Sequence, residues 1–413
     1  MNILVIGGGV IGVSCAIELH NRGHTVTIYD PDGFGRGASF GNAGVIAVTE
    51  YGPIATPELI RSIPSLLISK NTPITLRATY LPQMLPWLIK FAKSANKKQV
   101  AHACEALSSL LLAAAEAHYK IAQAAGVQGM IEPNGWYKAF ETDTGYAAAR
   151  AGFEMAANYG IEYEYLSQDE FYAREPNLIS GGMRFKHAVY SPQCPQIRNP
   201  GRYVELLGEY FLKQGGRLEI AEISKLVMND GVITHALSGT HMIDADAFVI
   251  AAGAWSRRLA AECGSNIPLD TERGYLMEIE ADASKLASAP ILWGERSIVM
   301  SPRDDSLRVT SSVEFAGLHA KPHYALVTKH ESAVRSLYGE NLGQMQSKWL
   351  GFRPSMPDSL PVISKSKADN AFLAFGHGHL GLTLGPITGL LIADLLCGNA
   401  PSFDLSPFSA NRF

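Results

Sequence analysis

Residues 2–30 of the chain, NILVIGGGVIGVSCAIELHNRGHTVTIYD, decide how it folds. Residues 2–6 form a short apolar run that leads into a cluster of glycines, the pattern of a β-strand, a tight turn and a helix start. Gly7, Gly9 and Gly12 stand at the spacing G-x-G-x-x-G. The stretch therefore predicts the opening strand, turn and helix of a dinucleotide-binding fold.

Each of these glycines has a physical reason to lack a side chain. Gly7 permits the tight turn, Gly9 lets the backbone approach a pyrophosphate, and Gly12 lets the following helix pack closely on the strand. The helix predicted over residues 10–21 points its amide-rich, positive end at the phosphates. We therefore count Val10 and Ile11, in its first turn, among the cofactor-binding residues.

A second apolar strand, predicted over residues 25–29, delivers Asp30 beside this turn. Its carboxylate can accept hydrogen bonds from both ribose hydroxyls of an adenosine, and it would repel a 2′-phosphate, so NADP is disfavoured. The alternative is a glycine-rich turn in an unrelated α/β protein. The strand, the helix and the acid in register argue against that alternative.

The composition is that of a globular chain and argues against nucleic-acid binding and metal chemistry. At 413 residues, 47% of them hydrophobic, the chain can bury a large core and has the length of two or three domains. Its net charge of −4 comes from 39 acidic and 35 basic residues without a basic block, so we expect no nucleic-acid partner. The five cysteines lie far apart without a C-x-x-C pair, which predicts neither a disulfide framework nor a metal site.

The next informative stretch, residues 31–48, is dense in glycine and small residues, which suits a segment lying against something flat or anionic. The opening fingerprint and the sequence SFGNAG at residues 39–44 resemble the flavoproteins of the D-amino acid oxidase superfamily, and within it the bacterial D-amino acid dehydrogenases. The resemblance implies that the cofactor is FAD. It also implies that Ser39 lies at the FAD pyrophosphate and that the backbone of Asn42, Ala43 and Gly44 follows the isoalloxazine.

Two later segments resemble the adenosine half of the FAD site in the same family. Residues 247–255, AFVIAAGAW, are an apolar strand that runs into a glycine turn, similar to the second flavoprotein signature. The resemblance implies that Gly253 and Trp255 bind FAD and that the backbone of Ile223 meets the adenine. An ordinary buried parallel strand is the alternative for residues 247–255.

The candidate substrate-binding residues also come from the resemblance. Residues 349–354, WLGFRP, are similar to a family segment in which the arginine binds the substrate carboxylate, which here is Arg353. A guanidinium suits this role because its planar fork can hold a carboxylate with two hydrogen bonds. Tyr275 resembles a substrate-facing tyrosine of the family, although a tyrosine in a strand can equally be a core residue.

Residues 373–383, LAFGHGHLGLT, read as a strand, a glycine loop and the start of an apolar helix. In the family this helix points at the N1 and C2 oxygen of the flavin, which implies a second positive helix end at the cofactor. His379 occupies a position that carries another basic or polar group in relatives, and we include it as a catalytic candidate with an open role. The loop contains no cysteine for a covalent flavin. The implied cofactor-binding residues are Gly378, Leu380, Gly381, Leu382 and Thr383.

The predicted fold is α/β (α+β), with a Rossmann-like FAD-binding domain and a substrate domain built on a mixed sheet. The FAD-binding domain is expected to comprise residues 1–50, 199–262 and 350–413, and the substrate-binding domain residues 51–198 and 263–349. Residues 191–198 match no motif, and the sequence leaves their role open.

One stretch raises the question of a membrane. Residues 81–93 place Leu81, Leu85, Leu88, Ile89 and Ala92 on one helical face, and Lys90, Lys93, Lys97 and Lys98 follow. A membrane-surface helix that delivers electrons to a membrane quinone is one interpretation. We expect instead that this face packs on the substrate domain, because single amphipathic helices usually face a core.

The start of the predicted nucleotide-binding strand at residue 2 leaves no room for a signal peptide, and no run of about 18 apolar residues spans a membrane. We therefore expect a cytoplasmic protein, with association at the inner face of the membrane as the further option. The sequence leaves the oligomeric state open.

The resemblance implies an enzyme that oxidatively deaminates a D-amino acid or a cyclic D-imino acid, such as D-proline or hydroxy-D-proline, by hydride transfer from Cα to flavin N5. Two alternatives stay open. The chain could be an oxidase of glycine, sarcosine or another secondary amine that uses O2, or a non-catalytic flavin-binding subunit of a larger dehydrogenase. The preferred side chain and the electron acceptor are not fixed by the sequence.

Overall fold

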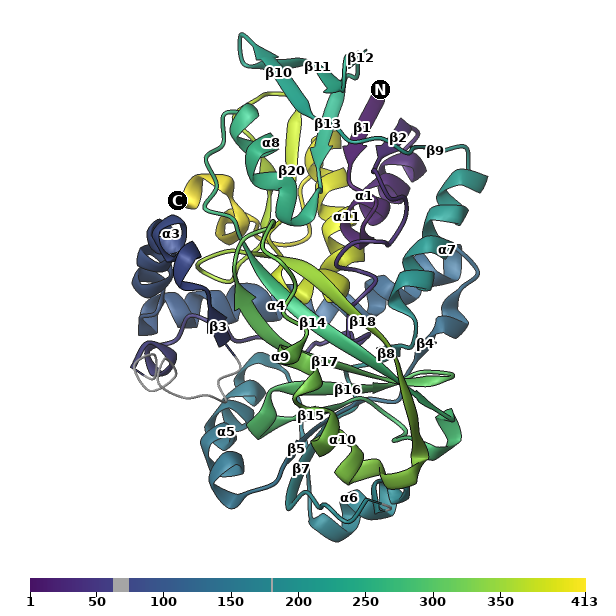
Figure 1. The fold of residues 1–413 in the computed structure, drawn as a ribbon. Helices are drawn as coiled ribbons and strands as arrows, with labels where there is room; N and C mark the ends of the chain where they lie inside the picture. Colours follow the sequence, from purple (N-terminus) through teal and green to yellow (C-terminus); the bar gives the residue numbers. More distant parts are fainter. Residues whose placement is uncertain (62–73, 180) are drawn as a thin grey trace.

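The computed structural model describes residues 1–61, 74–179 and 181–413. Figure 1 shows two layered units joined by a long antiparallel ribbon. The upper unit is built on a six-stranded sheet and the lower unit on a nine-stranded sheet. The predicted α/β class, with a nucleotide-binding sheet beside a mixed second sheet, is confirmed.

The six-stranded sheet has the order β19-β20-β13-β1-β2-β9. All neighbouring strands are parallel except the edge strand β19, which runs antiparallel to β20. In sequence order its strands are β1 (Asn2–Ile6), β2 (Thr25–Tyr29), β9 (Arg217–Glu219), β13 (Ala247–Ile250), β19 (Val362–Lys365) and β20 (Ala371–Phe375).

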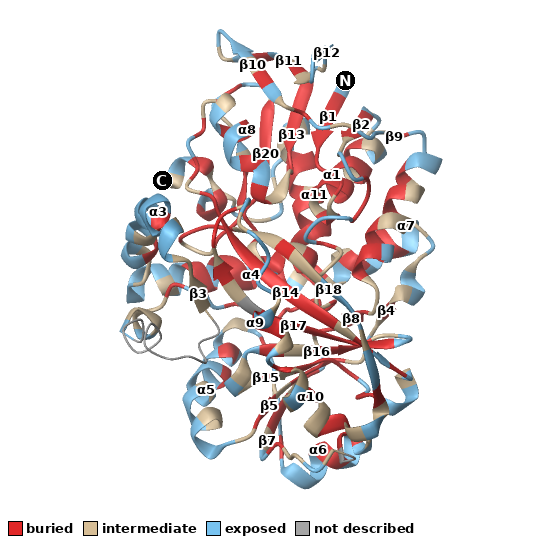
Figure 2. Ribbon diagram, in the orientation of Figure 1, coloured by how far each residue is buried: buried red, intermediate tan, exposed pale blue. Residues whose placement is uncertain are grey.

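Both faces of this sheet are covered, which explains why its central strands β1, β13 and β20 are almost wholly apolar (Figure 2). Ile3 and Val5 of β1 point into the core beneath the helices α1 (Val10–Asn21), α4 (Lys97–Ala124), α7 (Pro200–Lys213) and α11 (Gly381–Cys397). Leu4 and Ile6 point to the opposite core, under a three-stranded sheet and α8 (Ser256–Glu262). The three strands are β10 (Lys225–Asn229), β11 (Val232–Ser238) and β12 (His241–Ile243).

The nine-stranded sheet follows the path β18-β14-β17-β16-β15-β5-β7-β6, and β3 pairs with β17 off this path. The helices α5 (Asp143–Ala156), α6 (Gln168–Arg174), α9 (Ala325–Thr328) and α10 (Glu331–Tyr338) lie around it (Figure 1). Its strands are β3 (Ile74–Leu76), β5 (Trp136–Phe140), β6 (Glu164–Leu166), β7 (His187–Ser191), β14 (Asp270–Ala281), β15 (Ile291–Trp293), β16 (Ile298–Pro302), β17 (Ser306–Phe315) and β18 (Leu342–Ser355).

β14 and β18 form the ribbon that connects the two units, and they pair along almost their whole length (Figure 1). The predicted domain boundary at residue 350 falls inside β18. The long helix α4, from the predicted substrate segment, packs in the same core as α1 and α11. The exact division into domains stays a prediction.

The elements of the opening fingerprint are confirmed with the predicted bounds, as β1, α1 and β2. The sequence Asn199-Pro200 predicts a helix start, and this helix is α7, capped by the side chain of Asn199, which accepts the N–H of Arg202. The sequence pattern also predicts one strand over residues 218–223 and two strands over 307–311 and 312–315, and here the structure differs. β9 ends at Glu219, and residues 306–315 form one strand, β17, which pairs with both β14 and β16.

The face of α3 (Leu81–Ser94) that we expected to be packed is exposed, so this expectation is wrong. Leu81, Leu85 and Ile89 are 41%, 52% and 49% exposed, respectively. The helix packs instead through Met84, Trp87 and Phe91. The aromatic pair stacks at 5.1 Å, and the indole of Trp87 lies against Phe315 and donates to the carbonyl of Ser355. Two aromatic side chains bury more surface than the aliphatic stripe, so they decide which face turns inward.

Two helical segments are long and apolar enough to cross a membrane by length and composition, residues 97–124 and 378–397. In the structure 72% of the second segment and 44% of the first lie inside the protein. Both contribute buried residues to the core beside the six-stranded sheet. Their apolar character is therefore explained by packing inside the protein.

Candidate active site

A cavity of about 1210 Å³ lies between the six-stranded sheet and the nine-stranded sheet, which we call the substrate-side sheet. It collects almost all of the site residues predicted from the sequence, although they are spread over 380 residues of chain. The predicted residues that line it are Gly7, Gly9, Val10, Ile11, Asp30, Ser39, Asn42, Ala43, Ile223, Gly253, Trp255, Tyr275, Arg353, Gly378, His379, Leu380, Gly381 and Leu382. Gly12, Gly44 and Thr383 are not part of its lining.

The three fingerprint glycines have different tasks in the structure. Gly7 has φ +117°, and a Cβ there would lie 2.4 Å from the carbonyl oxygen of Ala251. A Cβ on Gly12 would lie 1.9 Å from the carbonyl oxygen of Gly7, so Gly12 permits close packing of α1 on the turn. A Cβ on Gly9 would have only Ser39 Oγ within 4 Å, at 3.5 Å, so Gly9 leaves the cavity side of the turn open. This is the space that a pyrophosphate needs.

Polar groups surround this turn. Ser39 Oγ accepts the N–H of Val10 at 3.1 Å and thereby ties the 39–44 loop to the start of α1. The carboxylate of Asp30 accepts the N–H of Gly8 at 2.7 Å and the N–H of Asp32 at 2.9 Å. Burial raises the pKa of Asp30, and these backbone hydrogen bonds oppose that shift. Carboxylate oxygens have capacity for further hydrogen bonds, so Asp30 can still receive ribose hydroxyls.

The 39–44 loop, expected to follow the isoalloxazine, is supported by residues 191–198, whose role the sequence left open. The carbonyl of Gly44 accepts the N–H of Ile197 at 2.6 Å, and the carbonyl of Pro195 accepts the N–H of Ile46 at 2.9 Å. A Cβ on Gly44 would lie 2.3 Å from the carbonyl oxygen of Ile197, which explains why Gly44 packs on this support and not on the cavity. Asn42 Oδ1 closes the turn by accepting the N–H of Gly44 at 2.8 Å.

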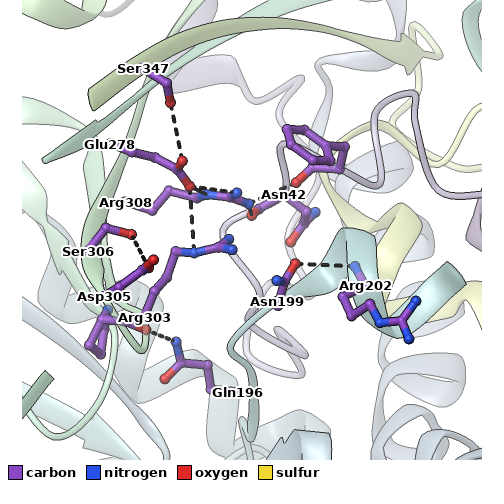
Figure 3. A network of polar contacts seen from close by, with 12 residues as sticks. Asn42, Gln196, Asn199, Arg202, Glu278, Arg303, Asp305, Ser306, Arg308 and Ser347 are labelled. Atoms are coloured by element: carbon purple, nitrogen blue, oxygen red, sulfur yellow. Dashed lines mark hydrogen bonds and ion pairs between the residues drawn. The ribbon is translucent and has the colours of Figure 1, made fainter. Parts of the chain in front are cut away.

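Arg308 of β17 holds the same loop from the substrate side (Figure 3). Its Nη1 donates to the backbone carbonyls of Phe40 and Asn42, each at 2.8 Å, while Nη2 donates to Glu278 at 2.8 Å. Burial, with the nearby charge of Arg303, lowers the pKa of Arg308 to about 10, so it stays charged at neutral pH. Arg303 lies 3.6 Å from Glu278 and outside the cavity lining, so it is not placed to bind substrate.

Arg353 is in β18 and lines the cavity, and its guanidinium lies over the neighbouring strand β14. A Cβ on Gly274 would lie 2.3 Å from Cζ of Arg353, so the glycine of β14 makes room for the guanidinium. Burial lowers the pKa of Arg353, and the charge of Glu272, its cross-strand neighbour, opposes that shift. The arrangement places a planar cation in an enclosed cavity, which suits a carboxylate ligand.

Glu272 is the centre of a cluster that the sequence did not predict. Its side chain is 3% exposed, and its two oxygens accept Ser355 Oγ at 2.5 Å and His379 Nε2 at 2.8 Å. Burial raises the pKa of Glu272, but these hydrogen bonds and the charges of His379 and Arg353 outweigh burial and hold that pKa below its usual value. Of the three predicted catalytic residues, His379 is hydrogen-bonded to this buried carboxylate and Arg353 is its cross-strand neighbour.

Tyr275 lines the cavity with its ring, but its hydroxyl is engaged elsewhere. The hydroxyl donates to Glu314 at 2.5 Å and accepts the N–H of His323 at 3.1 Å. Burial, together with Glu314, raises the pKa of Tyr275 to about 12. Glu314 is fully buried and also pairs with Arg77 and Arg273. The structure therefore gives Tyr275 a fixed wall position, and its predicted contact with substrate stays a prediction.

The remaining predicted residues are Ile223, Trp255 and those at the start of α11. In the described part of the chain no hydrogen bond engages the backbone of Ile223, which leaves it available to an adenine edge. Trp255 is half exposed and meets the ring of Phe352 edge-on at 5.5 Å. At the other end α11 begins at Gly381 on the cavity. Thr383 Oγ1 accepts the N–H of Ala47 at 3.0 Å, so Thr383 braces the loop from behind.

A buried histidine fixes the start of α11. His118 of α4 bonds through Nε2 to the carbonyl of Leu382 at 2.8 Å and through Nδ1 to the Tyr203 hydroxyl at 3.1 Å. Burial lowers the pKa of His118 to about 4, so it is neutral at pH 7. The neutral ring can donate from Nε2 and accept at Nδ1, which satisfies both contacts.

The residues present fit FAD. An open glycine turn, an acid at the end of β2, an unengaged backbone at Ile223 and a second helix start meet in one elongated cavity. Within the described residues no group of three or more His, Cys, Asp or Glu side chains is arranged to hold a metal ion. Sequence reasoning missed Glu50 in the lining, because it belongs to no motif, and gave no role to Gly41 and Trp349, although both lie inside quoted motifs.

Proteins of known family are similar to this chain over its full length. The family described as FAD dependent oxidoreductase (DAO) matches residues 2–395. A D-amino-acid oxidase of Bradyrhizobium diazoefficiens is 36% identical over 420 residues, which cover 100% of this chain and 99% of that protein. A D-amino acid dehydrogenase of the same organism is 26% identical over 424 residues, again with 100% and 99% covered.

Solved structures agree in fold. Glycine oxidase from Geobacillus kaustophilus superposes with a TM-score of 0.74 at 22% identity and covers 100% of this chain and 98% of its own. L-proline dehydrogenase from P. horikoshii superposes with a TM-score of 0.75 at 17% identity and covers 100% and 97%. At these identities the two structures show the fold alone.

We predict that the FAD is tightly bound but not covalently attached, since the 377–383 loop offers no cysteine. Acid precipitation of the purified yellow protein should move the flavin absorbance into the supernatant. A pellet that stays yellow after acid and solvent extraction would show a covalent link. A colourless protein that binds NAD would contradict the cofactor assignment itself.

Proposed function

We propose that this chain, which belongs to the family of FAD dependent oxidoreductases (DAO), oxidises D-amino acids or cyclic D-imino acids at Cα. Family membership makes the chain an FAD-dependent amino acid oxidoreductase. The D configuration is supported by the full-length relatives named D-amino-acid oxidase and D-amino acid dehydrogenase. The observation that carries the proposal is Arg353, a guanidinium on the wall of the cavity with its charge held by Glu272.

In this reaction Arg353 binds the substrate and FAD supplies the hydride acceptor. Arg353 grips the substrate carboxylate with a planar fork and so fixes which face of Cα is presented. FAD, when bound, accepts the hydride that leaves Cα. The substrate thereby loses a hydride and a proton and becomes an imine, which water hydrolyses to an oxo acid and ammonia when the nitrogen is primary. The protein contributes position and electrostatics to this chemistry.

The substrate-side wall of the cavity is mainly apolar. Leu292, Val299 and Val313 come from three strands of the nine-stranded sheet, and Trp136 lies on the same wall. Such a wall suits an aliphatic or cyclic side chain, and a pyrrolidine ring of a D-proline type substrate meets this description. We place the ring or side chain of the substrate against it.

The two other functions considered from the sequence differ in what supports them. An oxidase of glycine or sarcosine would use the same Arg353, and the fold shared with glycine oxidase does not separate the two substrate classes. A non-catalytic subunit has no need for a compensated arginine in an enclosed cavity, so that alternative loses support.

A substrate panel tests the proposed function. Under anaerobic conditions, D-proline and aliphatic D-amino acids should bleach the bound flavin, while their L-enantiomers should leave its spectrum unchanged. Glycine and sarcosine should bleach it more slowly, because they do not fill the apolar wall. Bleaching by L-amino acids alone, or by sarcosine alone, would contradict the proposed substrate class. A flavin that no amino acid bleaches would contradict the proposed reaction.

The second test concerns Arg353. A carboxylate held by two charge-assisted bonds in a desolvated pocket contributes about 2 to 5 kcal/mol, going by truncation of one partner of buried charge pairs. Arg353→Leu should therefore lower kcat/KM by about 30- to 5000-fold. Arg353→Lys is the matched control and should recover only part of this loss, because a point charge cannot reproduce the fork.

Both Arg353 variants should keep their FAD, since the nucleotide contacts lie elsewhere along the cavity. Amines without a carboxylate should be oxidised equally by the variants and the wild type. If both variants keep near wild-type kcat/KM for the best amino acid, Arg353 has a structural role only.

We further propose that electrons leave the enzyme for a quinone at the inner face of the cytoplasmic membrane, with α3 as the contact. Leu81, Leu85 and Ile89 are spaced four residues apart and form one exposed apolar stripe on α3. Exposed lysines border it at positions 90, 93, 97 and 98, and Lys90 lies over the ring of Phe413 at 5.6 Å. An apolar stripe edged by lysines is complementary to an anionic lipid surface.

The membrane proposal predicts that the protein floats with vesicles containing anionic phospholipid and not with neutral ones. The double variant Leu85→Glu, Ile89→Glu should reduce this binding at least about tenfold. It removes two apolar side chains that would be buried in the lipid surface and adds two negative charges that the anionic lipid repels. Leu112→Glu is the control, because Leu112 is similarly exposed on α4. Turnover with oxygen that equals turnover with an artificial quinone would contradict the choice of acceptor, and equal flotation of all variants would contradict the choice of surface.

A further inference from the structure

We propose that His379, held by Glu272, takes up the proton that the substrate ammonium loses before hydride transfer, with Glu272 as its positioning residue. The inference rests on the proposed function, because it assigns a proton acceptor to that reaction. An amino acid reaches the enzyme mainly with its nitrogen protonated at neutral pH. The nitrogen must become neutral before its lone pair can assist departure of a hydride from Cα, so one proton has to leave the substrate in the cavity.

The geometry places an imidazole beside the residue proposed to bind the carboxylate. His379 lines the cavity at the loop before α11, and Arg353 lines it from β18. Glu272 lies next to both residues: His379 donates to it at 2.8 Å, and Arg353 is opposite it on the neighbouring strand, where its charge lowers the pKa of Glu272. In an amino acid the carboxylate and the nitrogen are attached to the same carbon. A substrate whose carboxylate is on Arg353 therefore presents its nitrogen close to this cluster.

The hydrogen bond to Glu272 fixes how His379 can act. Glu272 is held in its charged form and can only accept, so Nε2 of His379 must carry a proton. In the neutral ring Nδ1 then has a lone pair, and in the described residues no hydrogen bond occupies it. The side chain is 42% exposed, so a proton taken up at Nδ1 can later pass to water. A carboxylate that orients an imidazole in one tautomer is a recurring arrangement in proton transfer.

Counting the charges in the cluster supports the same conclusion. Arg353 and Glu272 cancel each other before substrate binds, and a zwitterionic substrate adds no net charge. If the ammonium proton left for bulk water, the enclosed site would keep one uncompensated negative charge. Transfer of that proton to His379 breaks the substrate N–H bond, forms an Nδ1–H bond and leaves the net charge of the site unchanged. Unpaired buried charge is costly, so the internal acceptor is favoured.

The other titratable groups near His379 are engaged. The carboxylate of Glu50, whose charge acts on His379, bonds to Lys138 at 2.7 Å. His377 bonds through Nε2 to Thr388 at 3.0 Å and its Nδ1 has no partner, but burial lowers its pKa to about 3, so it is a weak base at neutral pH. The Tyr275 hydroxyl donates to Glu314. His319 also lines the cavity, but among the histidines of the described lining His379 is the one whose ring is hydrogen-bonded to a carboxylate.

The test uses the holoenzyme and a D-amino acid that bleaches the wild type, with flavin reduction followed in a single turnover at several pH values. His379→Asn should slow reduction by about 10²- to 10⁴-fold at neutral pH, the usual contribution of a positioned general base. Its rate should then rise about tenfold per pH unit, because only substrate that is already neutral in solution reacts. Wild-type reduction should level off at lower pH than this variant.

Glu272→Gln should lower the rate at least about tenfold and change the same pH profile, because an amide cannot stabilise the imidazolium as the carboxylate does. His379→Gly should regain part of its rate when imidazole is added, and the rescue should saturate. His241→Asn is the control, since His241 lies exposed on β12, on the far side of the FAD-binding unit from the substrate wall. Flavin absorbance per protein checks that each variant has folded and bound FAD.

A His379→Asn enzyme with the wild-type pH profile would overturn the proposal, even if its KM were raised, because that outcome describes a residue that only binds substrate. A rate within about threefold of wild type at all pH values would overturn it as well. Neither result touches the proposed function, which fails if no D-amino acid bleaches the wild-type enzyme.

Discussion

Arg353 carries a positive charge into the interior of the protein, and Glu272 on the neighbouring strand makes that burial tolerable. The antiparallel register of β14 and β18 places the two residues opposite each other. Two positions later in β14, Gly274 leaves the space in which the guanidinium lies. The charge of Glu272 favours the charged form of this arginine before any substrate arrives. Because His379 bonds to the same carboxylate, the loop that starts α11 is positioned by the same pair.

A second arginine performs a related task on the cofactor side. Arg308 reaches from the substrate-side sheet to two carbonyls of the 39–44 loop, while Glu278 balances its charge (Figure 3). The loop is also supported from below by Ile197 and Pro195. The segment expected to run along the flavin therefore belongs to neither sheet alone. Its position depends on Arg308 of the nine-stranded sheet and on residues 195–197, which lie outside both large sheets, so segments far apart in the chain together place this loop.

The sequence predicts well what is encoded locally. The bounds of β1, α1 and β2 follow from one apolar run, one glycine spacing and one acid within thirty residues. The contacts that complete the site escape such reasoning, because Glu272 and His379 are 107 residues apart and Arg308 and Phe40 are 268 apart. The prediction of which face of α3 is buried was wrong for a different reason. Helical periodicity identifies an apolar stripe, but it cannot weigh that stripe against Trp87 and Phe91 on another face.

The distribution of charge along the cavity gives each end a chemical role. Near the end of β2, Asp30, Asp32 and Glu222 line the cavity, and Arg258, which donates to the carbonyl of Ser224, lines it as well. The carboxylate of Asp30 suits ribose hydroxyls and repels an added phosphate. At the opposite end Arg353, His379 and the positive start of α11 converge. Under the proposed function, this group of positive charges would hold the substrate carboxylate and stabilise the negative charge of a reduced flavin. Because Arg353 is fixed on β18, an anionic substrate would be oriented with its carboxylate toward Arg353.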